Sequence, residues 1–119
     1  MKTTNEYIQL LRGYKRHHAA EYGIERMGIF GSVARGEQTQ NSDVDVYFES
    51  PSMSLFKMGG LMCDLEDLFG TRVDLIHKHK NLRPTFLHRI EKDIIYVSAL
   101  ITSLFLSRAL RLSGMEYFA

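Results

Sequence analysis

Apolar residues recur along the chain with two periods, which distinguish predicted helices from predicted strands. A spacing of three to four residues indicates an amphipathic helix, whereas alternation or a short apolar run indicates a strand. The helical spacing covers residues 4–21, 55–69 and 85–91, with a further short helix after Gly31. The strand patterns cover residues 24–30, 43–49, 73–77 and 94–97. Helices separate most of these strands, and this order predicts the α/β (α+β) class.

Glycine and proline residues mark several of the predicted ends. Gly36 and Gly70 follow helices, and Pro84 stands at a helix start, as these residue types commonly do. The pair Gly59–Gly60 would weaken the helix over 55–69 by about 1 kcal/mol per glycine relative to alanine. The start of this helix is therefore predicted either at residue 55 or near Gly60.

The helix over 55–69 carries a broad apolar stripe that is predicted to face the core. The stripe consists of Leu55, Met58, Leu61, Met62, Leu65, Leu68 and Phe69. Asp64, Glu66 and Asp67 are predicted to lie on the outer face, in solvent. Cys63 is the only cysteine, which excludes an internal disulfide, and its apolar neighbours predict a buried thiol in a reducing compartment.

Two carboxylates lie on one side of the predicted strand over 43–49. Because side chains alternate along a strand, Asp43 and Asp45 project from one face while Val44 and Val46 project from the other. Two anions about 6–7 Å apart repel by about 2–3 kcal/mol at an effective dielectric constant of about 20. A bound cation would reverse the sign of this interaction, so the pair is a candidate cation site.

A candidate phosphate-binding loop lies ten residues before this strand. Gly31 and Ser32 follow the apolar pair Ile29–Phe30. Glycine lets a backbone approach a phosphate closely, the serine adds a hydroxyl, and N–H groups at a helix start favour an anion. Arg35, one turn later, can reach the same anion with its forked guanidinium. Phosphate donors beside cation ligands predict metal-assisted attack on a nucleotide phosphate.

These motifs resemble the signature of the nucleotidyltransferase superfamily that includes DNA polymerase β. The resemblance rests on Gly31–Ser32, on Ala34–Arg35–Gly36 and on Asp43–Val44–Asp45. The wording GSVARGE…SDVDVYFE is most similar to small prokaryotic members, the minimal nucleotidyltransferases (MNT). The third acidic residue of the family lies on a later strand, and Asp74 in RVDLI matches that place. The resemblance covers about residues 24–76, and the order of elements extends it to about residue 97.

The resemblance implies a polymerase β-like fold, with a small mixed sheet flanked by helices. It also implies a two-metal Mg²⁺ site and ATP as the substrate, with hard oxygen ligands favouring magnesium over zinc. An acceptor hydroxyl would attack the α-phosphate, so that AMP is transferred and pyrophosphate leaves. The implied catalytic and metal-binding residues are Asp43, Asp45 and Asp74. The implied phosphate-binding residues are Gly31, Ser32 and Arg35.

MNT proteins are often paired with a HEPN protein, and the resemblance implies such a partner here. The HEPN protein would be a toxic ribonuclease that receives AMP on a tyrosine, and this chain would be its antitoxin. Two other classes stay open. The chain could be one subunit of an aminoglycoside-type, small-molecule nucleotidyltransferase, or a non-catalytic antitoxin that masks its partner sterically.

Residues 1–97 are predicted to form the nucleotidyltransferase domain and residues 98–119 an apolar helical extension. The helix expected over 98–112 is interrupted by Arg108 and Arg111 and is too short to span a membrane. An apolar stripe of this size is a liability in water. It is therefore predicted to pack on the domain's own sheet or on another chain, in a homo- or hetero-oligomer.

Charge and composition narrow the function classes. With 15 basic and 14 acidic residues, the net charge is +1, which gives no electrostatic reason to expect direct nucleic-acid binding. The 119 residues suffice for one domain that buries about two-thirds of its unfolded surface. The amphipathic start of the chain lacks the uninterrupted apolar core of a signal peptide, so the cytoplasm is the expected location.

Overall fold

The computed structural model of this protein describes residues 1–78 and 82–97. The helix predicted over 98–112 lies outside the described residues. Within them, no helix combines the length and the apolarity needed to cross a membrane. The elements are α1 (Thr4–Tyr22), β1 (Arg26–Phe30), α2 (Gly31–Arg35), β2 (Val44–Glu49), α3 (Leu55–Phe69), β3 (Val73–Lys78), α4 (Pro84–Glu91) and β4 (Ile95–Val97).

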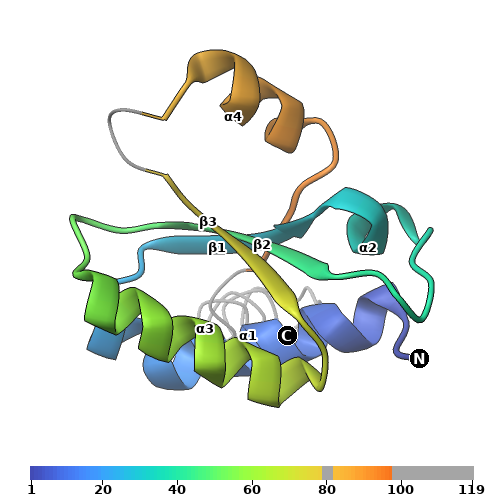
Figure 1. Cartoon of the computed structure of the whole chain (residues 1–119), viewed down its shortest axis with the longest axis horizontal. Helices are drawn as coiled ribbons and strands as arrows, with labels where there is room; N and C mark the ends of the chain where they lie inside the picture. The colour runs from blue at the N-terminus through green and yellow to red at the C-terminus, as the bar shows by residue number, and fades with distance from the viewer. Residues whose placement is uncertain (79–81, 98–119) are drawn as a thin grey trace, which may run out of the picture.

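The strands of this region form one mixed sheet in the order β3-β2-β1-β4 (Figure 1). β1 is antiparallel to both β2 and β4, whereas β2 and β3 are parallel. The parallel pair follows from α3, which carries the chain back from the end of β2 to the start of β3. The predicted α/β class, with a small mixed sheet flanked by helices, is therefore confirmed.

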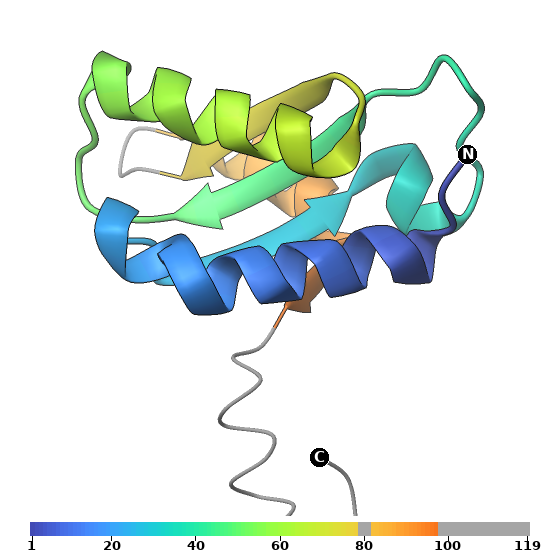
Figure 2. The same ribbon diagram turned by 90° about the horizontal axis from the view of Figure 1, so that it is seen from below.

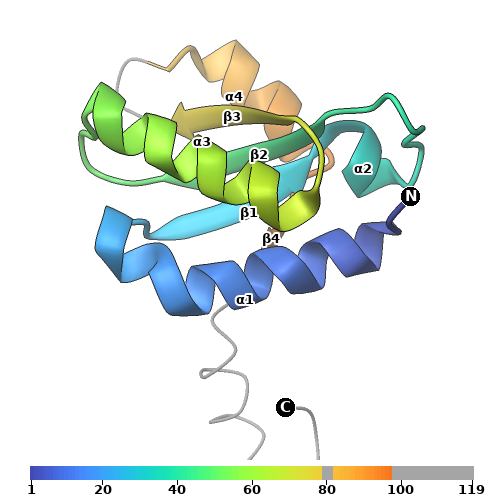
Figure 3. The same cartoon turned by 60° about the horizontal axis from the view of Figure 1, so that its bottom comes forward.

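α1 and α3 lie side by side across one face of the sheet (Figures 2 and 3). The strand side chains on this face are apolar and fully buried: Met27, Ile29, Val44, Val46 and Phe48. The helices fill the layer with Leu11, Leu61, Leu65 and Phe69. Because side chains alternate along a strand, the polar residues of β2 are left on the opposite face.

α4 lies on that opposite side of the sheet (Figure 1). Pro84 occupies its first turn, as predicted, and Ile90 is the buried residue of this helix. Tyr47 of β2 is also buried on this face, where its hydroxyl donates a 2.7 Å hydrogen bond to Glu49. This face is only partly covered at the start of β2, where Asp45 is half-buried and Asp74 on the neighbouring strand is exposed.

α3 begins at Leu55, so the alternative start near Gly60 is wrong. The reason is a side-chain cap, since Ser54 Oγ accepts the N–H of Lys57 at 3.1 Å and satisfies the first turn. Leu55 does not face the core, however, and is 87% exposed, as is Phe56 at 90%. The first turn of α3 extends past the ends of the strands, as Figure 3 shows.

Two further predictions for α3 are also wrong. Cys63 is exposed, because it lies two residues from both Leu61 and Leu65, and a helix turns by about 100° per residue. Asp64 is not a solvent-facing charge, since its Oδ2 accepts hydrogen bonds from Tyr14 at 2.8 Å and Tyr22 at 3.1 Å. The carboxylate thereby links α3 to α1.

Candidate active site

The parallel pairing of β2 with β3 places two predicted carboxylates side by side. Asp45 is the register partner of Asp74. Both stand between buried apolar neighbours of the core face, so both side chains project from the face that α1 and α3 leave open. Strand alternation and the crossover through α3 predicted this juxtaposition.

Asp43 lies just before β2, beside an arginine that the sequence did not single out. Arg72 Nε stands 3.2 Å from Asp43 Oδ1, which is within ion-pair distance. The two groups are not aligned for a hydrogen bond, and the buried Oδ1 accepts none within the described residues. Because Arg72 is 77% exposed, this ion pair is weak and leaves Asp43 available to another cation.

The site disfavours a charged Asp45. Burial, the charge of Asp74 and the charge of Asp43 together raise the pKa of the Asp45 carboxyl from 3.8 to about 6. Arg35 acts in the opposite direction and Asp93 adds to the increase. The mutual repulsion predicted for the two acids of β2 is therefore present, with Asp74 contributing more than Asp43.

Gly31 packs directly against Asp45. Phe30 is the register partner of Asp45, so the residue after Phe30 turns over the carboxylate. Gly31 has φ +74°, a left-handed conformation, and a Cβ at this position would overlap Asp45 Oδ2. Both observations restrict the position to glycine. The predicted phosphate loop and the predicted cation ligands are thus in contact.

The structure adds Asp93, which the sequence did not single out. Its Oδ1 accepts a 3.5 Å hydrogen bond from the Gly31 N–H, and its Oδ2 accepts one of 2.5 Å from Arg35 Nη1. Arg35 Nε also donates to Glu37 at 2.9 Å. Ser32 is half-buried at the second position of α2. Asp93 lies opposite Gly31 only because β4 pairs with β1, and sequence patterns do not reveal that pairing.

The donor set fits a hard divalent cation such as Mg²⁺. Asp43, Asp45 and Asp74 offer carboxylate oxygens, one of them buried without a hydrogen bond, and their repulsion is what a cation relieves. Within residues 1–78 and 82–97, no three such groups are drawn together closely enough to form a complete metal-ligand cluster. These side chains would therefore have to turn toward an ion as it binds.

We expect Asp45→Asn to stabilise the metal-free protein by about 1 kcal/mol at pH 8. Full burial would make the pKa shift worth about 3 kcal/mol, but Asp45 is half-buried and partly screened by solvent. Since folding raises the pKa of this acid, the wild type loses stability as the pH rises from 3.8 to about 6. Urea unfolding in EDTA should show the gain at pH 8 and none near pH 4. A destabilised variant at pH 8 would contradict this account.

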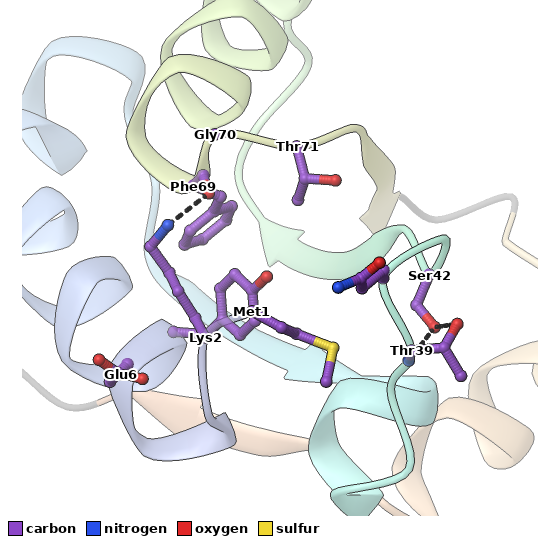
Figure 4. A pocket seen from close by; sticks show the side chains of 10 residues that line it. Met1, Lys2, Glu6, Thr39, Ser42, Phe69, Gly70 and Thr71 are labelled. Atoms are coloured by element: carbon purple, nitrogen blue, oxygen red, sulfur yellow. Dashed lines mark hydrogen bonds between the residues drawn. The ribbon is translucent and has the colours of Figure 1, made fainter.

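Two hollows lie near the site. The larger, of about 480 Å³, opens on the side of α1 and α3, where Thr39 and Ser42 face Phe69 and Lys2 (Figure 4). None of the three carboxylates lines it. The smaller, of about 200 Å³, adjoins the site itself. Its lining consists of Phe30, Gly31, Arg35, Phe86, Arg89, Ile90 and Asp93.

Sequence comparison finds relatives that match most of the chain. The family model described as "Polymerase beta, Nucleotidyltransferase" matches residues 15–99. A Methanocaldococcus jannaschii protein named "putative protein adenylyltransferase" is 40% identical over 100 residues, which cover 82% of this chain and 100% of the relative. The Thermococcus cleftensis "protein adenylyltransferase MntA" is 34% identical over 98 residues, covering 82% of this chain and 98% of the relative.

Solved structures share the fold. One described as a "putative minimal nucleotidyltransferase" is 29% identical and has a TM-score of 0.66, covering 79% of this chain and 95% of that chain. Another is described as a tri-AMPylated Shewanella oneidensis HEPN toxin in complex with MNT antitoxin. It is 15% identical with a TM-score of 0.52, covers 93% of this chain and 83% of that chain, and shows likeness of fold alone.

Proposed function

The chain belongs to the polymerase β nucleotidyltransferase family and is a nucleotidyltransferase, and we propose that it transfers AMP from ATP to a tyrosine hydroxyl of a HEPN-type ribonuclease toxin. In this role it is the antitoxin of a toxin–antitoxin pair. The observation that carries the proposal is the Asp45–Asp74 pair against Gly31, in a chain similar over most of its length to protein adenylyltransferases.

In the proposed reaction the chain first binds the nucleotide phosphates. The Gly31 N–H and the Arg35 guanidinium already hold an anionic group, the carboxylate of Asp93, and the same donors suit the β- and γ-phosphates. Ser32 adds a hydroxyl to this loop. These contacts orient the α-phosphate toward the acidic side of the site.

Asp43, Asp45 and Asp74 would hold Mg²⁺, which neutralises the triphosphate and the charge that develops on the leaving group. The acceptor oxygen forms a bond to the α-phosphorus as the bond from that phosphorus to the bridging oxygen breaks. Pyrophosphate leaves with the bonding electron pair. Asp74, the exposed member of the trio, takes the proton of the attacking hydroxyl.

The partner assignment rests on the relatives. The curated relatives are named protein adenylyltransferases, and a structure of the same fold pairs an MNT antitoxin with an AMPylated HEPN toxin. We assign residues 1–97 to catalysis and residues 98–119 to contact with the partner, through the apolar stripe over 98–112. The cytoplasm, which supplies ATP and Mg²⁺, is the proposed location.

The proposal is tested by the intact mass of a HEPN-type protein that co-purifies with this chain. Incubation with this protein, ATP and Mg²⁺ should add the mass of one or more AMP units, and peptide mapping should place them on tyrosine. EDTA should prevent the gain, because the three carboxylates have no cation to hold.

Each negative result has its own meaning. A tight complex without any mass gain would replace the enzymatic antitoxin with a steric one. Transfer to an aminoglycoside in the absence of the protein partner would favour the small-molecule class. A mass gain that persists in EDTA would refute the metal assignment while keeping the transfer.

A further inference from the structure

Asp93 occupies the position that the proposed function assigns to a nucleotide phosphate. Its two carboxylate oxygens accept from the Gly31 N–H at 3.5 Å and from Arg35 Nη1 at 2.5 Å. These contacts join residues 62 and 58 positions apart in the sequence. The carboxylate reaches them from the turn between α4 and β4, since the β1–β4 register, continued past Ile29 and Ile95, sets Asp93 opposite Gly31.

We propose that Asp93 is an internal competitor for the nucleotide phosphates: it holds the Gly31 and Arg35 donors in the empty enzyme and must leave them when ATP binds. This inference rests on the proposed function, because it takes Gly31 and Arg35 as phosphate ligands. A carboxylate and a phosphate oxygen make the same charge-assisted hydrogen bonds to a guanidinium or a backbone N–H. Because the Gly31 N–H has a single hydrogen, Asp93 and a phosphate that binds there compete for it.

Charge makes the competition stronger. Asp43, Asp45 and Asp74 already give this corner of the molecule three carboxylates, and Asp93 is a fourth next to the same loop. A triphosphate adds further negative charge. If Asp93 stayed in place, it would lie within a few ångströms of that charge in a partly buried site, where like charges repel strongly.

The surroundings of Asp93 leave room for it to move. It is half-buried, follows the last turn of α4, and is tied to that turn by a 3.3 Å bond from its N–H to the carbonyl of Ile90. The hollow of about 200 Å³ beside it is lined by Phe86 and the exposed Arg89. A carboxylate that leaves Arg35 can turn into this hollow without unfolding the strand that follows.

A competitor of this kind lowers the affinity of every phosphate ligand that needs the Gly31 and Arg35 donors, by a factor set by how rarely Asp93 leaves them. A single phosphate offers little more charge than the carboxylate it has to displace. ATP with its bound cation offers several phosphate oxygens at once and displaces Asp93 more readily. The affinity of both falls by the same factor, so ATP, which makes more contacts, is the ligand that still binds.

The test is the dissociation constant of ATP, measured by calorimetry with Mg²⁺ on the full chain. Asp93→Asn keeps the size of the side chain and removes its charge, and it should tighten ATP binding about tenfold. Glu37→Gln is the matched control, because Glu37 also pairs with Arg35, at 2.9 Å, but lies in an exposed loop. We expect it to change the affinity by less than about threefold.

The outcomes separate this inference from the proposed function. If Asp93→Asn binds ATP no more tightly than the wild type, or binds it more weakly, Asp93 organises the loop. That result would overturn this inference alone. Loss of transfer at saturating ATP would also overturn it, by giving Asp93 a part in the chemistry. Absence of ATP binding in the wild type and all variants would overturn the phosphate site itself. If thermal unfolding shows that Asp93→Asn is not folded, Asp93→Ser, which removes the same charge, is used instead.

Discussion

Replacing Asp43 or Asp45 with asparagine should lower the rate of AMP transfer by at least about 1,000-fold while the fold survives. Removal of one preorganised electrostatic contact commonly costs 100- to 1,000-fold in rate, and loss of a cation ligand acts on both the attacking and the leaving oxygen. The measurement is the initial rate of AMP incorporation into the proposed HEPN-type partner, or of pyrophosphate release, at saturating ATP and Mg²⁺.

Glu49→Gln is the matched control for these variants. Glu49 lies on β2, on the same face as Asp45, and removal of its charge changes the net charge equally. Its partners are Tyr47 and Arg26, at the other end of the strand from the proposed metal ligands. Its activity should stay within about threefold of the wild type, because its partners do not belong to the proposed site and a glutamine oxygen can still accept from Tyr47. Substantial transfer by Asp43→Asn or Asp45→Asn would contradict the two-metal assignment.

Asp45 is expected to respond in opposite directions in the two assays. The asparagine variant should be more stable without metal and should also be inactive, because the same crowding of carboxylates that costs stability forms the proposed cation site. Such a trade between stability and activity is common where function needs a strained arrangement. A residue that only supported the fold would lower both quantities together.

Much of the site follows from sequence because its parts are close together in the chain. Alternation places Asp43 and Asp45 on the face opposite Val44 and Val46, and this requires only that the segment is a strand. Asp74 joins them because a strand that follows a helical crossover usually lies beside the strand before it. The structure contains that parallel neighbour, with Asp45 and Asp74 in register.

The features that the sequence does not predict depend on contacts between segments far apart in the chain. The sequence shows that residues 94–97 form a strand but not that this strand pairs with β1, and only that pairing sets Asp93 over Gly31 and Arg35. The stripe on α3 likewise identifies apolar residues but not where the sheet ends, so Leu55 was placed in the core.

The contact between Gly31 and Asp45 is seen only in the three-dimensional structure. It is the basis of the second large expected effect. Gly31→Ala should destabilise the protein by about 3 kcal/mol and abolish most transfer activity. About 1 kcal/mol comes from placing an alanine at φ +74°, and the rest from the overlap of its Cβ with Asp45 Oδ2. The activity falls because the displaced group is a proposed metal ligand.

Gly36 provides the comparison that isolates these two causes. It has nearly the same conformation, φ +72°, but the nearest atom to an added Cβ is Thr4 Oγ1 at an ordinary 3.9 Å. Gly36→Ala should therefore cost about 1 kcal/mol and retain activity. In an Asp45→Ala background the overlap is gone, so Gly31→Ala should cost no more than Gly36→Ala. The coupling energy between Gly31→Ala and Asp45→Ala should therefore be about 2 kcal/mol, which urea unfolding can resolve. Equal costs for the two glycine variants in the wild-type background would mean that backbone conformation alone, and not contact with Asp45, requires glycine at position 31.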